Sequence, residues 1–199
     1  MSYSQAGYVE LMEAARDPDH VVTLAFAGLI ALADHRPAPY DVPIAALDAE
    51  ALAALRERYF PELTAPLYGA RSALSGEACA PPPIDEFDDL LAMLMDCRTY
   101  DDQESTWLAH AVATACMGSK HLWQDMGLPN RTALSRLISH YFSVLAERNV
   151  SDMKWKKFFY RQLCEREGLV LCQAPSCGNC SDYLKCFGPE DANPLLGLN

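Results

Sequence analysis

The stretch that decides the fold is Met153-Lys154-Trp155-Lys156-Lys157-Phe158-Phe159-Tyr160-Arg161-Gln162-Leu163-Cys164. At helical spacing, large apolar side chains share one of its faces, namely Trp155, Phe158, Phe159 and Leu163. This stripe predicts packing against a hydrophobic core. Another face is basic and carries Lys154, Lys157 and Arg161. The pattern predicts a helix over residues 153–167, which Asn149 or Ser151 caps and Gly168 closes.

Upstream of this helix, apolar periodicity and capping residues predict further helices. They cover about residues 7–15, 21–34, 48–59, 84–97, 99 or 101 to 117, 121–126 and 132–148. Asp48 and Asn130 are typical N-cap residues for two of these helices. The sequence has no alternating apolar pattern of useful length, so a sheet is not expected. We therefore expect an all-α fold, an irregular helical bundle with a C-terminal cysteine-rich metal-binding loop.

The chain divides into two parts by composition. Residues 1–168 form the expected helical domain, and residues 169–199 form a cysteine-rich cluster-binding tail packed on the last helix. Gly69, Gly76 and the run Pro81-Pro82-Pro83 predict a linker around residues 69–83 inside the helical domain.

The charge of the chain limits the classes of function. The formal net charge is −11, which disfavours nucleic-acid binding by the chain as a whole. The longest apolar run, residues 21–33, is too short to cross a bilayer, which needs roughly 20 residues. The N-terminus shows no basic segment followed by an apolar run. We therefore expect a cytoplasmic protein with no membrane partner.

Four of the eight cysteines lie in the tail, with the spacing Cys172-x4-Cys177-x2-Cys180-x5-Cys186. Thiolates are soft ligands that suit iron–sulfur clusters, zinc and Cu(I). Structural zinc sites usually use two close cysteine pairs, and only one such pair is present here. The first two gaps match plant-type ferredoxins, but the fourth cysteine lies too near for that motif. The spacing favours an iron–sulfur cluster and leaves a zinc site and disulfides as alternatives.

The basic face of the last helix adjoins these cysteines in an otherwise acidic chain. Nearby cations lower the pKa of thiols and offset the negative charge of a sulfide cluster. They also attract an oxyanion such as molybdate, whose oxygens suit Lys and Arg donors. We therefore predict that Lys154, Lys157 and Arg161 act on a cluster or an oxyanion, with a solvated basic face as the alternative.

The spacing of the tail cysteines resembles the signature of the NifQ family, molybdenum–iron–sulfur proteins of nitrogenase cofactor assembly. The run Asp152–Cys164 and the segment His121-Leu122-Trp123-Gln124-Asp125-Met126-Gly127-Leu128 are similar to that family as well. The close likeness covers roughly residues 101–188. The N-terminal half has only its helical pattern and Arg58-Tyr59-Phe60-Pro61 in support.

The resemblance implies a metallocluster carrier rather than a turnover enzyme. Such a protein takes in molybdate or a sulfur-bound precursor, processes it on an iron–sulfur core and donates molybdenum for the iron–molybdenum cofactor. Its expected cofactor is a molybdenum–iron–sulfur cluster, with an iron–sulfur precursor form. Its expected partners are the nitrogenase cofactor scaffold and the nitrogenase iron protein. The alternatives are a zinc-stabilised helical interaction module and an iron–sulfur electron carrier.

The ligand set follows from the need to release molybdenum. Four cysteines, Cys172, Cys177, Cys180 and Cys186, can hold the four metal corners of a cubane. A donor must release its molybdenum, so one corner should be held weakly. In a second arrangement, three cysteines hold three irons, and molybdenum has a labile or non-cysteine ligand. Cys164 and His121 are the candidates for an extra ligand. The alternative interpretations are that Cys164 is a buried helical thiol and that His121 has a structural or capping role. The remaining thiols, Cys79, Cys97 and Cys116, are expected in the core or at the surface.

Overall fold

The computed structural model describes residues 3–64, 67, 85–169, 177 and 180–190. Within these ranges it contains helices and no strand, so the expected all-α class is confirmed there. The elements are α1 (Tyr3–Glu13), α2 (Val21–Ala31), a 3-10 turn η1 (Ala33–His35), α3 (Ala49–Tyr59), α4 (Asp85–Asp96), α5 (Gln103–Cys116), α6 (Leu122–Asp125), α7 (Arg131–Tyr141), α8 (Ser143–Arg148), α9 (Trp155–Arg166) and α10 (Tyr183–Phe187). The predicted linker around residues 69–83, Cys79 and Cys172 lie outside the described residues.

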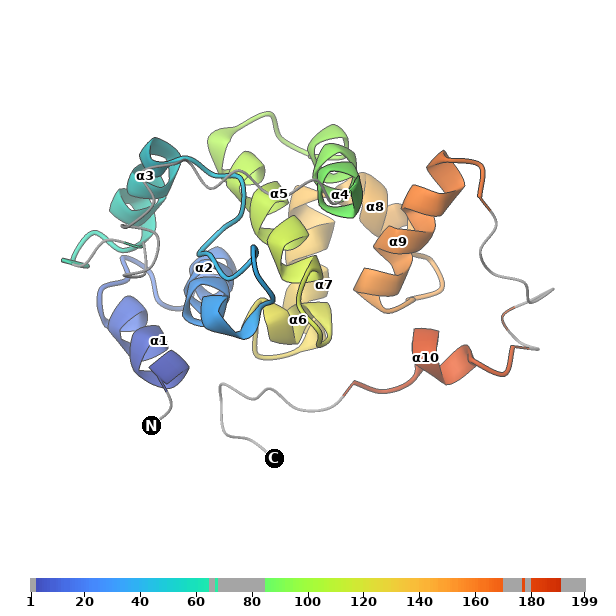
Figure 1. Ribbon diagram of the computed structural model, residues 1–199, viewed down its shortest axis with the longest axis horizontal. Coiled ribbons are helices and arrows are strands. Elements are labelled where there is room, and N and C mark those ends of the chain that lie inside the picture. The colour runs from blue at the N-terminus through green and yellow to red at the C-terminus, as the bar shows by residue number, and fades with distance from the viewer. Residues whose placement is uncertain (1–2, 65–66, 68–84, 170–176, 178–179, 191–199) are drawn as a thin grey trace.

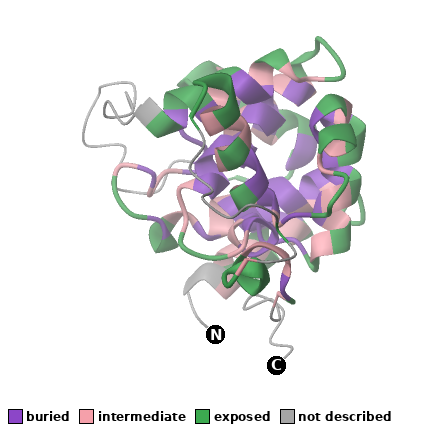
Figure 2. Ribbon diagram, turned by 90° about the vertical axis from the view of Figure 1, so that its right-hand side faces the viewer, coloured by how far each residue is buried: buried purple, intermediate pink, exposed green. Residues whose placement is uncertain are grey.

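Helices α2 and α5 form the centre of the molecule. Helix α2 packs against α1, α5 and α7, while α5 packs against α2, α4 and α6. Neither helix has an Asp, Glu, Lys or Arg beyond its first turn, and both are buried along most of their length. Figure 1 shows α1 and α3 at one end of the molecule and α9 at the other, and Figure 2 shows buried residues on the inward faces of the helices.

Glycine allows the central helix to approach its neighbour. A Cβ atom on Gly28 of α2 would lie 2.5 Å from the carbonyl oxygen of Met126 and 2.6 Å from the Cα of Gly127. These are backbone atoms of the turn that ends α6, and real Cβ atoms do not come so close. A side chain at position 28 would therefore separate α2 from α6.

The predicted N-caps are confirmed where a short polar side chain begins the helix. Asp48 accepts a hydrogen bond from the Ala51 amide at 2.8 Å, and Asn130 accepts one from the Ala133 amide at 2.9 Å. The predicted cap of α9 by Asn149 or Ser151 is wrong, because Lys154 occupies the N-cap position and its side chain makes no capping hydrogen bond. It ends as predicted at Gly168, whose φ of 68° lets the Leu169 amide donate to the Cys164 carbonyl.

The helix predicted over residues 132–148 is wrong as a single element. The structure breaks it at Phe142, where φ is −139° and ψ is 51°. The loop residue Thr99 causes the break, because its amide donates to the Tyr141 carbonyl at 2.8 Å and its hydroxyl accepts from the Ser143 amide at 3.0 Å. Phe142 is thereby turned into the core, where none of its side chain is exposed.

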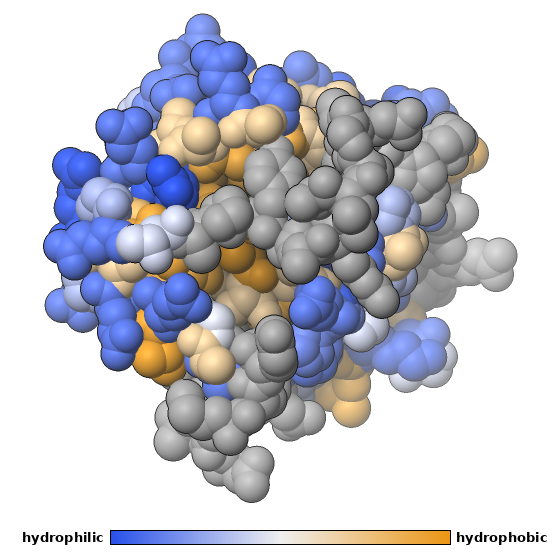
Figure 3. All heavy atoms as spheres, turned by 60° about the vertical axis from the view of Figure 1, so that its left-hand side comes forward, coloured by the Kyte–Doolittle hydropathy of each residue, from blue (hydrophilic) through white to orange (hydrophobic). Residues whose placement is uncertain are grey.

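On the face at the α1–α3 end, hydrophilic side chains fill most of the coloured periphery and hydrophobic ones show between them (Figure 3). Among the described residues, no helix has both the length and the apolar character that crossing a bilayer requires.

Candidate functional site

The start of α9 is fixed in place by two side chains from other elements. Asn149 brackets Met153, accepting from its amide and donating to its carbonyl, both at 2.9 Å. Arg131 at the start of α7 donates to the carbonyls of Asp152 and Met153 and forms an ion pair with the Asp152 carboxylate at 2.8 Å. The aromatic face of α9 then packs as predicted, since Trp155, Phe158 and Phe159 are all buried. The first turn of α9 is thus held rigidly against the bundle.

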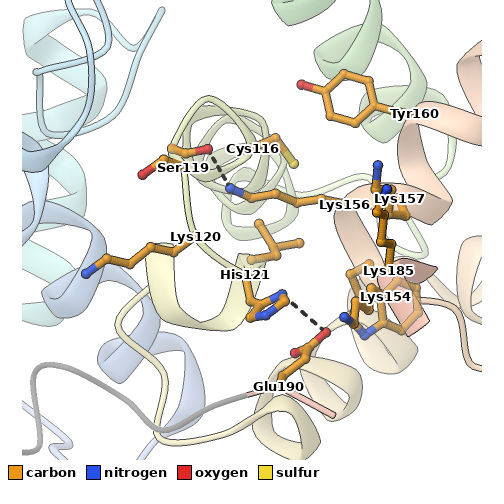
Figure 4. A pocket seen from close by; sticks show the side chains of 13 residues that line it. Cys116, Ser119, Lys120, His121, Lys154, Lys156, Lys157, Tyr160, Lys185 and Glu190 are labelled. Carbon is orange, nitrogen blue, oxygen red and sulfur yellow. Dashed lines mark hydrogen bonds and ion pairs between the residues drawn. The ribbon is translucent and has the colours of Figure 1, made fainter. Parts of the chain in front are cut away.

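A cavity of about 330 Å³ lies against this first turn. We call it the lysine pocket, because all five lysines of the chain line it: Lys120, Lys154, Lys156, Lys157 and Lys185. They come from three separate segments, namely the loop before α6, the start of α9, and α10. In Figure 4, Lys154, Lys157 and Lys185 gather on one side, Lys156 crosses the centre, and Lys120 extends on the opposite side.

Asp125 organises the loop that forms one side of the lysine pocket. Its carboxylate accepts from the Lys120 amide at 2.9 Å and pairs with the Lys156 ammonium at 2.5 Å. The same ammonium donates to the Gly118 carbonyl at 2.9 Å. Helix α6 and the start of α9 are therefore joined through a half-buried ion pair rather than by apolar packing alone.

The C-terminal tail forms the opposite side. The amide of Lys154 donates to the Cys186 carbonyl at 2.8 Å, and its ammonium donates to the Leu184 carbonyl at 3.1 Å. Further along, the Glu190 carboxylate lies 3.6 Å from His121 Nδ1 and 3.6 Å from an Arg131 guanidinium nitrogen. These contacts place α10, with its cysteine, directly beside the lysine pocket.

Two weakly acidic groups complete the lining. Burial raises the pKa of the Cys116 thiol to about 12, against a smaller opposite effect of Lys156. Burial also raises the pKa of the Tyr160 hydroxyl above its usual value. Both groups therefore stay protonated at neutral pH and add no negative charge to the lysine pocket. Cys116 is a buried thiol, as expected.

Three of the four tail cysteines lie in the described part of the chain. Cys177 is exposed, while Cys180 and Cys186 are half-buried. The Cys180 amide donates to the Cys177 carbonyl at 3.2 Å, so the backbones of these two residues lie close together. Across the described ranges, no three His, Cys, Asp or Glu side chains meet as a metal site, and the fourth thiol, Cys172, lies outside those ranges. The donor types nevertheless suit an iron–sulfur group, because all four are soft thiols that lie close together in the sequence.

The structure brings together some of the residues singled out from the sequence. His121, Lys154 and Lys157 line the lysine pocket, next to the helix that carries Cys186. Arg161 lies outside it, in a second hollow, and pairs with Glu165 at 2.8 Å. Cys164 lies near the far end of α9, about 15 Å along the axis from Lys154 at about 1.5 Å per residue.

Sequence reasoning missed four contributors to this lining, namely Lys120, Lys156, Lys185 and Glu190. Lys156 falls between the two helix faces, and the others lie in loops or in a helix that has no periodic signal. One signal could have found the lysines: residues 1–119 contain arginine as their only strongly basic residue type, and every lysine lies between residues 120 and 185.

Comparison with known proteins supports the resemblance. The sequence model of the NifQ family matches residues 25–188. A protein named NifQ from Azotobacter vinelandii is 43% identical over 150 residues, covering 72% of this chain and 77% of that protein. A protein named NifQ from Rhodobacter capsulatus is 38% identical over 139 residues, covering 70% of this chain and 73% of that protein. No solved structure gives a significant match. Because the matched region spans most of the sequence, the chain belongs to the NifQ family.

Proposed function

We propose that this protein is a molybdenum carrier that binds molybdenum on an iron–sulfur core and donates it for assembly of the nitrogenase iron–molybdenum cofactor. The observation that carries the proposal is the contact between the tail and the lysine pocket. The backbone bond from Lys154 to Cys186 places a thiol-bearing helix beside all five lysines of the chain. Membership of the NifQ family supports the same role.

In this proposal, Cys172, Cys177, Cys180 and Cys186 hold the iron–sulfur core, which supplies sulfide and iron as the soft platform for molybdenum. The backbone hydrogen bond from Cys180 to Cys177 brings these two residues close together, which suits two thiolate ligands of one metal. The adjacent ammonium groups offset the negative charge that thiolates and sulfides bring together. Such compensation favours the cluster-bound tail in a chain whose net charge is −11.

A donor protein must also release its cargo, so at least one protein ligand should bind the molybdenum weakly. Of the two extra candidates, His121 lines the lysine pocket beside α10, whereas Cys164 sits at the other end of α9. We therefore assign His121, rather than Cys164, as the group that helps to hold or release molybdenum. Its Nδ1 lies 3.6 Å from the Glu190 carboxylate, so the other ring nitrogen is the one that we expect to contact the cargo.

The proposed recipients are the nitrogenase cofactor scaffold and the nitrogenase iron protein. Delivery to a scaffold is a transfer of cargo between proteins, so the role is that of a donor and not of a turnover enzyme. Exposed acidic side chains at the start of α4 give the carrier a negatively charged surface for a basic partner surface.

Metal analysis of anaerobically purified protein tests this proposal. We expect iron and acid-labile sulfide in stoichiometric amounts, molybdenum after loading, and a paramagnetic resonance signal that changes when molybdenum enters. Incubation with the purified scaffold should move molybdenum to it. One tightly bound zinc without iron would instead indicate an interaction module, and a redox-active cluster that never takes up molybdenum would indicate an electron carrier.

Substitution of single cysteines tests which of them bind the iron–sulfur core. Cys177→Ala or Cys180→Ala should remove most of the bound iron, because each takes away one soft ligand. Cys97→Ala is the matched control, since this half-buried thiol lies outside the tail and should leave the iron content unchanged. Unchanged iron in Cys177→Ala and Cys180→Ala would rule out the tail as the binding segment.

A further inference from the structure

We propose that the lysine pocket is a binding site for a tetrahedral dianionic oxyanion, separate from the tail thiols. Every residue of this site lies in the described part of the chain. Only the identification of the anion as molybdate rests on the proposed function. The lysine pocket would then capture the anion next to the thiols, with no change in its oxidation state.

The distribution of lysine is the first argument. The chain has sixteen basic side chains, eleven of which are arginines spread along its length, yet all five lysines line one cavity. Bringing like charges from three segments to one place raises the free energy of the fold through their repulsion. A bound anion would relieve that repulsion, whereas a solvated basic face would need no such convergence.

The balance of charge around the cavity fits a dianion. Asp125 neutralises Lys156 at 2.5 Å, and Asp182 neutralises Lys185 at 2.7 Å. Glu190, the one carboxylate in the lining, adds a third negative charge, and its contacts are with His121 and Arg131. Counted against Asp125, Asp182 and Glu190, the five lysines leave two formal positive charges, which equals the charge of molybdate or sulfate with opposite sign. The chain as a whole has a net charge of −11, so its surface outside the lysine pocket repels such an anion.

The available donors also suit tetrahedral geometry. Lys154 and Lys157 begin α9, where the first-turn amides have no partner within the helix and the dipole is positive. The first turn of α9 contains no acidic residue. A lysine ammonium has three donors on a flexible stem, so several can adapt to oxygens that point in different directions. The Tyr160 hydroxyl, which stays protonated, adds a neutral donor.

Glu190 gives the site an internal competitor. Its side chain is only 7% exposed, and its carboxylate reaches the cavity from the tail while it contacts His121 and Arg131. A carboxylate here lowers the affinity for any second anion by electrostatic repulsion. This contact predicts substitutions of opposite sign: loss of a lysine should weaken oxyanion binding, and neutralisation of Glu190 should strengthen it.

The test is calorimetric titration of the full-length protein with sodium molybdate, sodium sulfate and sodium nitrate in chloride buffer. We expect one saturable site for molybdate and a weaker one for sulfate, with no binding of the planar monoanion nitrate. Affinity should fall as chloride is raised, because ions screen the ammonium groups. Equal or tighter binding of sulfate would contradict molybdate as the physiological anion.

Two variants change the charge of the cavity with opposite sign, one by removing positive charges and the other by removing a negative charge. Lys120→Gln/Lys157→Gln should weaken molybdate binding at least about tenfold, as expected for the loss of charge-assisted hydrogen bonds. Glu190→Gln keeps the shape of the side chain and should tighten binding several-fold. The matched control, Arg136→Gln/Arg148→Gln, removes the same charge from exposed positions outside the lysine pocket and should change affinity less than about twofold.

A variant with all four tail cysteines changed to serine separates this inference from the proposed function. It should lose iron and keep oxyanion binding, with circular dichroism confirming that its helices remain. If the folded variant no longer bound the anion, the binding site would have to include the tail thiols, and the proposal would be overturned. If the four-serine variant unfolds, the double lysine variant and the double arginine control, both made in the wild-type protein, still test the proposal. Equal weakening of molybdate binding by the two would also overturn the proposal.

Discussion

Glu104 shows how single polar residues hold this bundle together. Its carboxylate accepts hydrogen bonds from the hydroxyls of Tyr59 and Tyr141 and pairs with the Arg58 guanidinium at 2.5 Å. Burial raises the pKa of Glu104, but the two tyrosine hydrogen bonds and the nearby arginine outweigh it and hold the pKa below its ordinary value of 4.5. One side chain thus links α3, α5 and α7.

The Glu104→Gln variant should show a pH-dependent loss of stability. A lowered pKa in the folded state stabilises the protein above pH 4.5, and this contribution is lost as the pH falls through the folded-state value. At pH 7 we expect the variant to be less stable by about 1–3 kcal/mol, the cost of an imperfectly paired buried group. Urea unfolding at a series of pH values measures the difference, which should shrink in acid. The exposed Glu57→Gln is the control, and a pH-independent difference would contradict this account.

Arg36 is a charged residue whose role is structural. It is 5% exposed and donates to the carbonyls of Leu29, Tyr40 and Val42 at 2.9, 2.7 and 2.5 Å. Burial lowers the pKa of the guanidinium to about 10, in spite of three acidic neighbours, so the group stays charged at neutral pH. Its hydrogen bonds go to the end of α2 and the loop that follows, in contrast to the lysines around the cavity.

At the scale of elements, close contacts between backbones decide where the helices lie. Helix α2 meets the turn after α6 through Gly28, and this contact sets the position of the loop that begins the lysine pocket. Helix α9 is placed by Asn149 and Arg131, which bind backbone atoms before its first turn. The residues that position the helices therefore lie mostly outside the site.

Glycine substitutions in α1 and α2 should have opposite effects. Gly28→Ala should destabilise the protein by about 1–3 kcal/mol, because the new methyl group would lie 2.5 Å from a backbone oxygen. Gly7→Ala in α1 should stabilise it by about 0.5–1 kcal/mol through helix propensity, since no atom lies within 4 Å of the place that its methyl group would take. Chemical unfolding of both variants measures the two changes. Equal stability of Gly28→Ala and wild type would show that α2 and α6 can separate freely.

At the scale of the whole molecule, the tail and the helical body are joined by a few polar contacts. The amide of Lys154 donates to the Cys186 carbonyl, and Glu190 reaches back to His121 and Arg131. Metal bound to the tail would restrict its motion, so the stability of these contacts should depend on metal occupancy. The Lys154 amide is the natural reporter of this coupling.

Hydrogen exchange of backbone amides tests the coupling. In metal-loaded protein the Lys154 amide should exchange at least about tenfold more slowly than after chelation, because opening of its hydrogen bond then requires movement of a metal-bound segment. The Thr99 amide, which donates to the Tyr141 carbonyl at 2.8 Å, is the control and should not change. Equal protection of Lys154 in the two states would show that the tail binds metal without acting on the body.

The sequence by itself determined the class of the fold and several of its details. Asp48, Asn130 and Gly168 mark helix ends through interactions within a few residues, so a local pattern was enough to find them. The aromatic stripe of α9 correctly predicted a core-facing side, because helical periodicity alone decides which residues share a face. The cysteine spacing and neighbouring motifs also led to the NifQ family.

Tertiary structure alone decided the features that depend on distant contacts. The break between α7 and α8 arises from Thr99, 44 residues before Ser143, and α10 is too short to form without a body to pack on. The lysine pocket joins three segments that are far apart in the chain and meet only through the fold, so Lys120 and Lys185 carried no local signal. Arg161 and Cys164 follow Lys154 along the same helix, yet the rise of the helix carries them away from the lysine pocket. Proximity in the sequence therefore indicated the right helix, and only packing selected which of its residues meet at the site.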